Sequence, residues 1–246
     1  MKFPAKYVES KSVGTHRFLP GIRPPDTMAA FHEDGVRAEG KFDRLQQQFQ
    51  TALVRILLQY VQERQTKTTY SMAFRNLKTN SRTVFRDYYA RVYAAGRGQA
   101  PAFLDPAAQD WVKKAATTEY QFWEKFVRQV HEGEIIDPTQ RVLYYVDSLK
   151  AVFHAGRVAS TPDMIVISWE PDPKAKHCNG CLFLARSGPY VRESLPTTPK
   201  AGDCVCKFNC QCTLVYRAAV SRREYMQVRR GVAIRGTMLR SLRSLR

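Results

Sequence analysis

All six cysteines of this 246-residue chain lie between Cys178 and Cys212. Three kinds of chemistry use clustered thiols. A disulfide framework is typical of small secreted domains, where the bridges link distant segments. A redox motif of the thioredoxin type needs a single Cys-x-x-Cys and leaves four thiols unexplained. A structural metal site accounts for both the number and the grouping, so we favour it, while disulfides and free or redox-active thiols stay open.

The spacing of the cysteines indicates zinc. Cys178 and Cys181 form a Cys-x-x-Cys, in which Asn179-Gly180 predicts a tight turn that lets both sulfurs meet one ion. Four thiolates in a tetrahedron suit Zn²⁺, which leaves two sulfurs surplus. His177 is a further candidate ligand, although its place beside Cys178 makes joint chelation awkward. The other four cysteines are even numbers of residues apart, so an extended chain presents them on one side: Cys204, Cys206, Cys210 and Cys212.

Residues 41–160 have the apolar periodicity of about four amphipathic helices. The third is expected to start at Asp105 and the fourth at Asp137, because each acid is a helix cap followed by proline. Glu119 is the one polar member of the third stripe, and we expect it at the edge of that stripe. The stripes consist of Leu45, Phe49, Leu53, Ile56, Leu57 and Tyr60, then Val84, Tyr88 and Val92, then Val112, Ala116, Trp123, Phe126 and Val130, and finally Val142, Tyr145, Val146, Leu149, Val152 and Phe153.

The segments that flank this helical body have other patterns. Residues 1–40 are rich in proline and glycine and lack periodicity, which predicts an extended arm. Two short strands are expected, at 163–171 and in "CTLVYR". The predicted fold is therefore mainly α with a small α+β C-terminal module, a zinc-stapled β-hairpin. The expected parts are an extended N-terminal arm (1–40), a helical domain (41–160), a Cys-rich metal-binding module (161–216) and a basic C-terminal tail (217–246).

The formal net charge of +17 favours a polyanionic partner, either nucleic acid or an acidic protein surface. No apolar run is long enough to span a membrane, and the first residues lack the apolar core of a signal peptide, so we expect a protein made in a reducing cytosol without membrane contact. Arginines crowd the C-terminal tail. The candidate residues for binding nucleic acid or another partner are Arg222, Arg223, Arg229, Arg230, Arg235, Arg240, Arg243 and Arg246.

The cysteine window resembles the C-terminal module of phage minor head proteins, the head-morphogenesis family that includes the Mu F-like and SPP1-type minor capsid proteins. The resemblance rests on Trp169 followed by "HCNGC", "SGPY", "ESLPTTP" and "CKFNCQCTL", and it covers residues from about 140 to 216. Cys204 is an addition to the family pattern, and Gln211 stands where arginine is usual. The resemblance implies Cys178, Cys181, Cys206 and Cys210 as zinc ligands, with Cys212 next.

The resemblance also implies a structural role. Such proteins are minor components of the virion that contact the portal or the inner capsid and help assemble the head or deliver DNA. The basic tail of this chain, read from its residues, suits contact with packaged DNA. The alternative is a cytosolic zinc-ribbon protein that binds nucleic acid, although no recognition-helix or RNA-binding motif is present. The sequence has no nucleophile elbow, P-loop or HExxH pattern, and an all-thiolate site leaves no open metal position, so we expect no enzymatic activity.

Overall fold

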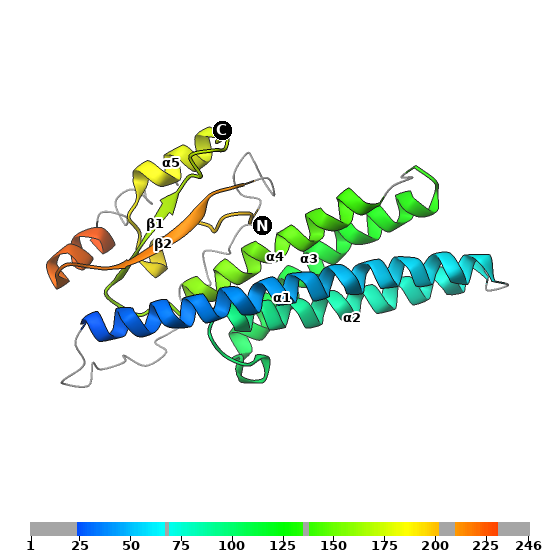
Figure 1. Ribbon diagram of the computed structural model, residues 1–246, viewed down its shortest axis with the longest axis horizontal. Helices are drawn as coiled ribbons and strands as arrows, with labels where there is room; N and C mark the ends of the chain where they lie inside the picture. The colour runs from blue at the N-terminus through cyan, green and yellow to red at the C-terminus, as the bar shows by residue number, and fades with distance from the viewer. Residues whose placement is uncertain (1–23, 67–68, 135–137, 202–209, 231–246) are drawn as a thin grey trace. The chain divides into compact units, whose positions relative to one another are not determined.

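The computed structural model describes residues 24–66, 69–134, 138–201 and 210–230 (Figure 1). As predicted, the fold is mainly helical, with a small two-stranded antiparallel sheet. The chain divides into two compact units. The helical unit comprises residues 37–157, and the cysteine-rich unit combines the residues before and after it. No helix in the described part of the chain is long and apolar enough to cross a membrane.

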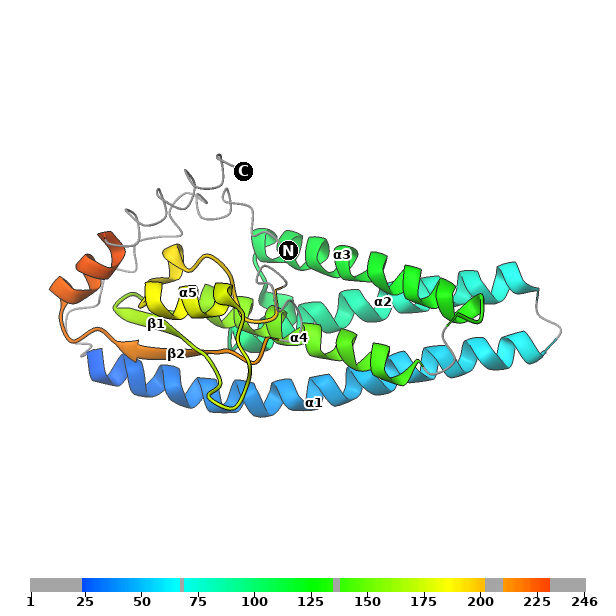
Figure 2. The same ribbon diagram turned by 90° about the horizontal axis from the view of Figure 1, so that it is seen from above.

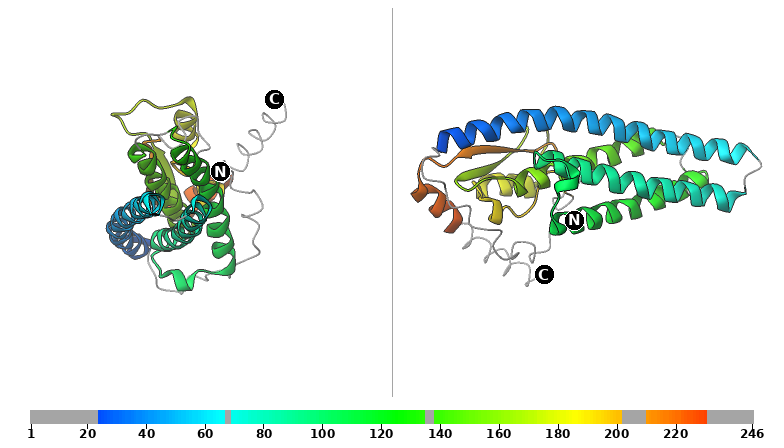
Figure 3. Two further views of the ribbon diagram at one scale, coloured as in Figure 1. Left: turned by 90° about the vertical axis from the view of Figure 1, so that its right-hand side faces the viewer. Right: turned by 90° about the horizontal axis from the view of Figure 1, so that it is seen from below.

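Four long helices build the helical unit, and they run side by side (Figures 2 and 3). Aromatic side chains fill the space between them. Phe85 is fully buried and contacts the rings of Phe49 at 5.2 Å and Trp123 at 5.6 Å between centroids. Edge-to-face and tilted ring pairs of this kind add to the stabilisation from apolar burial. The helices are α1 (Pro24–Gln65), which begins in the cysteine-rich unit, α2 (Tyr70–Gly96), α3 (Pro106–His131) and α4 (Thr139–Ala159).

The helix-start signal at Asp105 acts as predicted, whereas Asp137, the start predicted for the fourth helix, lies outside the described residues. The Asp105 side chain accepts a hydrogen bond of 2.8 Å from the amide of Ala108, and Pro106 occupies the first turn of α3. After α2, Gly98 adopts a φ of +69°, a left-handed conformation that favours glycine. A short 3-10 helix, η2 (Pro101–Phe103), then leads into α3.

Two glycines allow α2 and α4 to touch through their backbones. A Cβ atom on Gly156 would lie 2.2 Å from the carbonyl oxygen of Tyr93, and one on Gly96 would lie 2.3 Å from that of Phe153. Real Cβ atoms essentially never come this close to another heavy atom. Only glycine therefore fits at either position without a shift of the helices.

Glu119 lies inside the bundle, although the sequence predicted it at the edge of its stripe. Its side chain is buried and hydrogen-bonds with Ser148, whose hydroxyl donates to the carbonyl of Tyr145 at 2.7 Å and lies 3.1 Å from the hydroxyl of Tyr89. Burial raises the pKa of Glu119 to about 7, and the hydrogen bond with Ser148 only partly offsets this effect. The stripe prediction failed here because three polar groups from neighbouring helices accompany the carboxyl into the core.

The extended arm predicted for residues 1–40 is wrong from Pro24 onward, because α1 already begins there. The buried positions of this part of α1 follow helical spacing, but Gly35 and Ala38 occupy two of them, so the apolar pattern is weak in the sequence. Phe31 supplies the anchor, since its ring packs edge-on against Tyr216 at 5.3 Å. Residues 1–23 lie outside the described part of the chain.

The cysteine-rich unit is built on two antiparallel strands, β1 (Ile165–Glu170) and β2 (Thr213–Ala218), both of which the sequence predicts. Trp169 pairs with Leu214 and Ile167 with Tyr216. The unit is not the predicted hairpin, because a helix, α5 (Asn179–Ser187), and a 3-10 turn, η3 (Arg192–Ser194), lie between the strands. It also has an apolar core of its own, which the sequence did not indicate.

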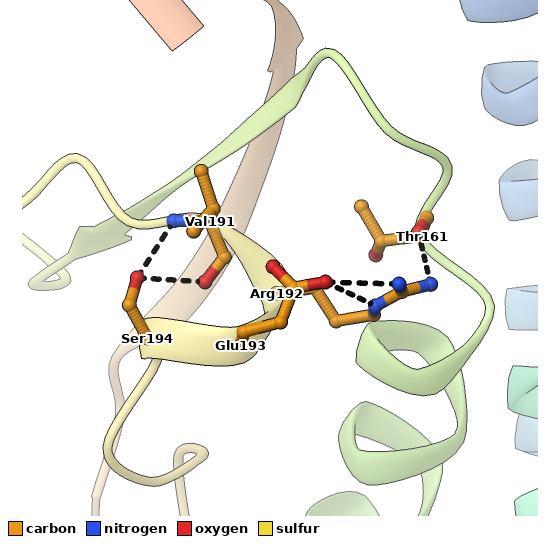
Figure 4. A network of polar contacts seen from close by, with 5 residues as sticks. All are labelled: Thr161, Val191, Arg192, Glu193 and Ser194. Carbon is orange, nitrogen blue, oxygen red and sulfur yellow. Dashed lines mark hydrogen bonds and ion pairs between the residues drawn. The ribbon is translucent and has the colours of Figure 1, made fainter. Parts of the chain in front are cut away.

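The segment after α5 is held to the strand by backbone and side-chain bonds. Tyr190 exchanges two backbone hydrogen bonds of 2.7 Å with Ile167. Next to it, Ser194 accepts from the amide of Val191 at 3.0 Å, and Arg192 donates to the carbonyl of Thr161 at 3.1 Å while pairing with Glu193 (Figure 4). These bonds fix the connection that returns the chain toward the second group of cysteines.

The first part of the predicted basic tail, residues 217–230, has regular structure. Residues 217 and 218 belong to β2, and residues 222–230 form a helix. Tyr225 on this helix is buried in a cluster with Val166 and Val191. Ser221 caps the helix by accepting from the amide of Glu224 at 3.1 Å, and Glu224 pairs with Arg217 at 2.8 Å. Residues 231–246 lie outside the described part of the chain.

Candidate metal centre

Three buried thiols meet in the cysteine-rich unit. The sulfur atoms of Cys181, Cys210 and Cys212 all lie within 4.8 Å of one another, and those of Cys181 and Cys210 are 3.7 Å apart. Sulfurs bound to one zinc ion at ~2.3 Å in a tetrahedron are about 3.8 Å apart. The separation of Cys181 and Cys210 therefore suits a shared ion, with no large movement of the chain.

The cysteine pair at 178 and 181 is placed by the start of α5. Cys178 caps this helix, and its sulfur accepts the amide of Cys181 at 3.4 Å. Asn179 and Gly180 are thus the first two residues of a helix and not the predicted turn. The helix nevertheless achieves what the turn was expected to do, because its first turn carries the Cys181 sulfur into the core beside the strands.

The second pair is placed by the extended chain that leads into β2. Cys210 and Cys212 are both buried, whereas Gln211 between them is exposed. This alternation is the one expected for an extended chain, in which residues two apart share a side. The remaining predicted ligand, Cys206, lies outside the described residues, as does Cys204.

The arrangement gives Cys212 a larger part than the sequence indicated. The resemblance ranked it behind Cys178 and Cys206, yet its sulfur is in the cluster while that of Cys178 stands beside it, half-buried against the same core. No sequence signal separates Cys212 from its neighbours, because the choice depends on how deeply the chain before β2 buries each thiol.

The thiols differ in acidity. Burial raises the pKa of Cys212 to about 11. Burial also opposes ionisation of Cys210, but hydrogen bonds from backbone groups of Cys212 and Lys200 and from the side chain of Cys181 stabilise its thiolate and lower its pKa. Cys210 is therefore the first of this pair to ionise, and a metal ion must displace the proton of Cys212.

His177, a further candidate ligand in the sequence, is oriented toward this cluster. Its Nδ1 atom lies 3.7 Å from the sulfur of Cys212, and its Nε2 atom lies 2.5 Å from the carbonyl oxygen of Asp172. A carbonyl only accepts, so Nε2 carries the proton and Nδ1 faces the thiol with its lone pair. Histidines at metal sites are commonly held in this way, by donating the other ring N–H to a carbonyl.

An apolar shell encloses the thiols. The core cluster around them includes Ile167, Trp169, Leu184, Tyr190 and Leu214, all buried. The Tyr190 hydroxyl donates to the carbonyl of Leu184 at 2.7 Å, which ties α5 to the segment that follows it. Such a shell excludes water, so the geometry suits a structural ion and not an open catalytic one.

The predicted partner-binding arginines fall into two groups. Four of them are exposed on the helical segment 222–230: Arg222, Arg223, Arg229 and Arg230. The other four lie outside the described residues: Arg235, Arg240, Arg243 and Arg246. A scan against protein-family models finds no match to this chain, and searches of curated proteins and of solved structures find none either.

Proposed function

We propose that Cys178, Cys181, Cys210 and Cys212 hold a structural Zn²⁺ ion. The 3.7 Å between the sulfurs of Cys181 and Cys210 supports this assignment, as does the burial of three thiols in one apolar core. Cys178 completes the set because the amide of Cys181 and the N-terminal end of α5 stabilise its thiolate. His177 then stands beside Cys212 as a neighbour of the site, with its ring held by the carbonyl of Asp172.

Metal analysis of freshly purified, reduced protein tests the zinc assignment. We expect about one zinc per chain, lost in Cys181→Ser and kept in Cys204→Ser, a matched control outside the proposed set. Protein without zinc under these conditions would refute the assignment.

We further propose that the protein is a minor structural component of a bacteriophage head. The resemblance of residues 140–216 to phage minor head proteins is the observation that carries this proposal. The fold supports this proposal because seven residues of the motif are buried in one unit. They are Trp169, Tyr190, Thr197, Thr198, Cys210, Cys212 and Leu214. A pattern made of core positions specifies a fold, and a closed thiolate centre suits assembly and not catalysis.

In this role the protein contacts the portal or the major capsid protein, and its basic C-terminal segment neutralises packaged DNA. Arginine contacts to phosphate are independent of sequence and weaken with salt, which suits a protein between a shell and its genome. The protein is made in the host cytoplasm and retained in the virion.

Mass spectrometry of purified particles of the encoding phage tests this role. We expect a small number of copies per virion, and crosslinking should join them to the portal or capsid protein. A cytosolic zinc-ribbon protein that binds nucleic acid, the alternative supported by the +17 charge, would be absent from gradient-purified particles. Absence of this chain from purified particles would overturn the proposal that it is a virion component.

A further inference from the structure

The exposed side of α2 is strongly basic. This helix carries five basic residues and a single acid, Asp87, whereas α1 carries five basic and six acidic residues. Three of the six acids of α1 precede the helical unit. The part of α1 within that unit, residues 37–65, still carries three acids against five basic residues, so a general excess of arginine in the chain does not explain the contrast. The cations of α2 are Arg75, Lys78, Arg82, Arg86 and Arg91.

Four of these cations form one stripe. Arg75, Lys78, Arg82 and Arg86 follow one another at three- or four-residue steps, the spacing of one helix face. Arg91 points elsewhere and donates to Gln48 on α1. The arginines of the stripe are exposed, and among the described residues neither Arg75 nor Arg86 pairs with an acid. The stripe runs from Arg75 to Arg86, about 16 Å along the helix.

The neighbouring helix α3 continues the basic surface. The guanidinium of Arg82 lies 5.0 Å from the centre of the Tyr120 ring, Ser81 accepts from Trp123 at 2.9 Å, and Lys78 pairs with Glu124. These contacts define an antiparallel register that places Arg128 of α3 level with Arg75. Arg128 is exposed, and Glu124, the one acid within this stretch of the face, is already neutralised by Lys78.

We infer that this surface, the α2–α3 basic face formed by Arg75, Lys78, Arg82, Arg86 and Arg128, binds the phosphate backbone of a nucleic acid. The inference depends on neither the zinc centre nor the phage assignment, and it places a nucleic-acid contact away from the C-terminal arginines.

The composition of the face favours nucleic acid over an acidic protein. Protein interfaces usually have aromatic or aliphatic anchors at their centre. Between Arg75 and Arg86 the exposed positions of α2 are instead Thr79, Arg82 and Thr83, and hydroxyl and guanidinium groups are typical phosphate donors. The Tyr120 ring also holds Arg82 in place, which lowers the entropy lost when its guanidinium binds.

Binding of the full-length protein to a labelled DNA duplex of about 20 base pairs tests this inference, over a series of salt concentrations. The test variant replaces Arg75, Arg82 and Arg86 with Gln. The matched control replaces Arg37, Lys41 and Arg44, three exposed cations at similar helical spacing on α1, and a second control replaces Arg222, Arg223 and Arg230. Circular dichroism confirms that each variant is folded.

We expect the test variant to bind at least tenfold more weakly than the parent, and the slope of log K against log salt to fall by about 3. The α1 control should bind within twofold of the parent. Four results would overturn the inference: no binding of the duplex by the parent, an equal loss in the α1 control, a loss confined to the second control, or a test variant that keeps DNA binding but loses binding to polyglutamate, which would indicate an acidic protein partner. A loss confined to the second control would place the contact in the C-terminal segment and would leave the zinc and virion proposals standing.

Discussion

The sulfur atoms of Cys181 and Cys210 lie 3.7 Å apart, although 29 positions separate them along the chain. A helix start supplies one sulfur and the approach to a strand supplies the other. Each thiol is fully buried, so the pair is formed by the fold and not by a flexible surface loop. This relationship makes the assignment of metal ligands testable residue by residue.

The fourth ligand can be identified by substitution in cobalt-loaded protein. We expect Cys178→Ser to lower the intensity of the thiolate-to-cobalt charge-transfer band, because one sulfur leaves the ion. His177→Ala should keep the band, because it removes no sulfur from the ion. The opposite pattern, an altered spectrum in His177→Ala and an unchanged one in Cys178→Ser, would make His177 the fourth ligand.

The buried carboxyl of Glu119 should make the stability of the helical unit depend on pH. Its pKa rises from 4.5 to about 7 on folding, so the folded protein holds the proton more tightly than the unfolded chain. The stabilisation is complete below pH 4.5 and is lost as pH rises through about 7, at a cost of about 3 kcal/mol. In denaturant unfolding, Glu119→Gln should match the parent at low pH and exceed its stability above pH 7. Parallel pH profiles for the two proteins would contradict the burial of an ionisable Glu119.

The contact between α2 and α4 predicts opposite effects for two Gly→Ala substitutions. Gly156→Ala should destabilise the protein by about 2 kcal/mol or more, because its Cβ would meet the Tyr93 carbonyl oxygen at 2.2 Å. Gly40→Ala is the matched control in α1, where nothing lies within 4 Å of the added atom, and it should stabilise the helix by about 0.5–1 kcal/mol. Equal effects of the two substitutions in guanidinium unfolding would argue against the close approach.

The helical segment 222–230 should contribute to the stability of the cysteine-rich unit. Tyr225 is buried against Val166 and Val191, so Tyr225→Ala should cost about 2–3 kcal/mol. Gln227→Ala, on an exposed position of the same segment, should cost almost nothing. Protease resistance of protein purified without chelators measures the effects of both substitutions. Equal resistance of both variants and the parent would mean that this segment does not pack against the cysteine-rich unit.

Sequence patterns predicted the parts of the fold that depend on local signals. Asp105 with Pro106 marks the start of α3, and the β-branched run Ile165, Val166 and Ile167 marks β1, because capping and β-propensity depend only on neighbours along the chain. The beginning of α1 was missed where Gly35 and Ala38 take core positions, since small residues bury little surface and leave no apolar signal.

The candidate site was predictable in kind but not in detail. Six clustered cysteines indicate a metal centre. Which sulfurs meet depends on the turn of α5 that carries Cys181 and on how the chain before β2 places Cys210 and Cys212. The orientation of His177 depends on the carbonyl of Asp172, five residues away, which no spacing rule describes. Tertiary placement of this kind is absent from a one-dimensional pattern.

X-ray absorption at the zinc edge of the purified, reduced protein tests the metal centre most directly. The thiol cluster predicts zinc with three or four sulfur neighbours at about 2.3 Å. The Cys181→Ser variant should lose the metal or at least one sulfur from that shell. A zinc ion bound only by nitrogen and oxygen, or protein that contains no zinc while its thiols remain reduced, would contradict the account.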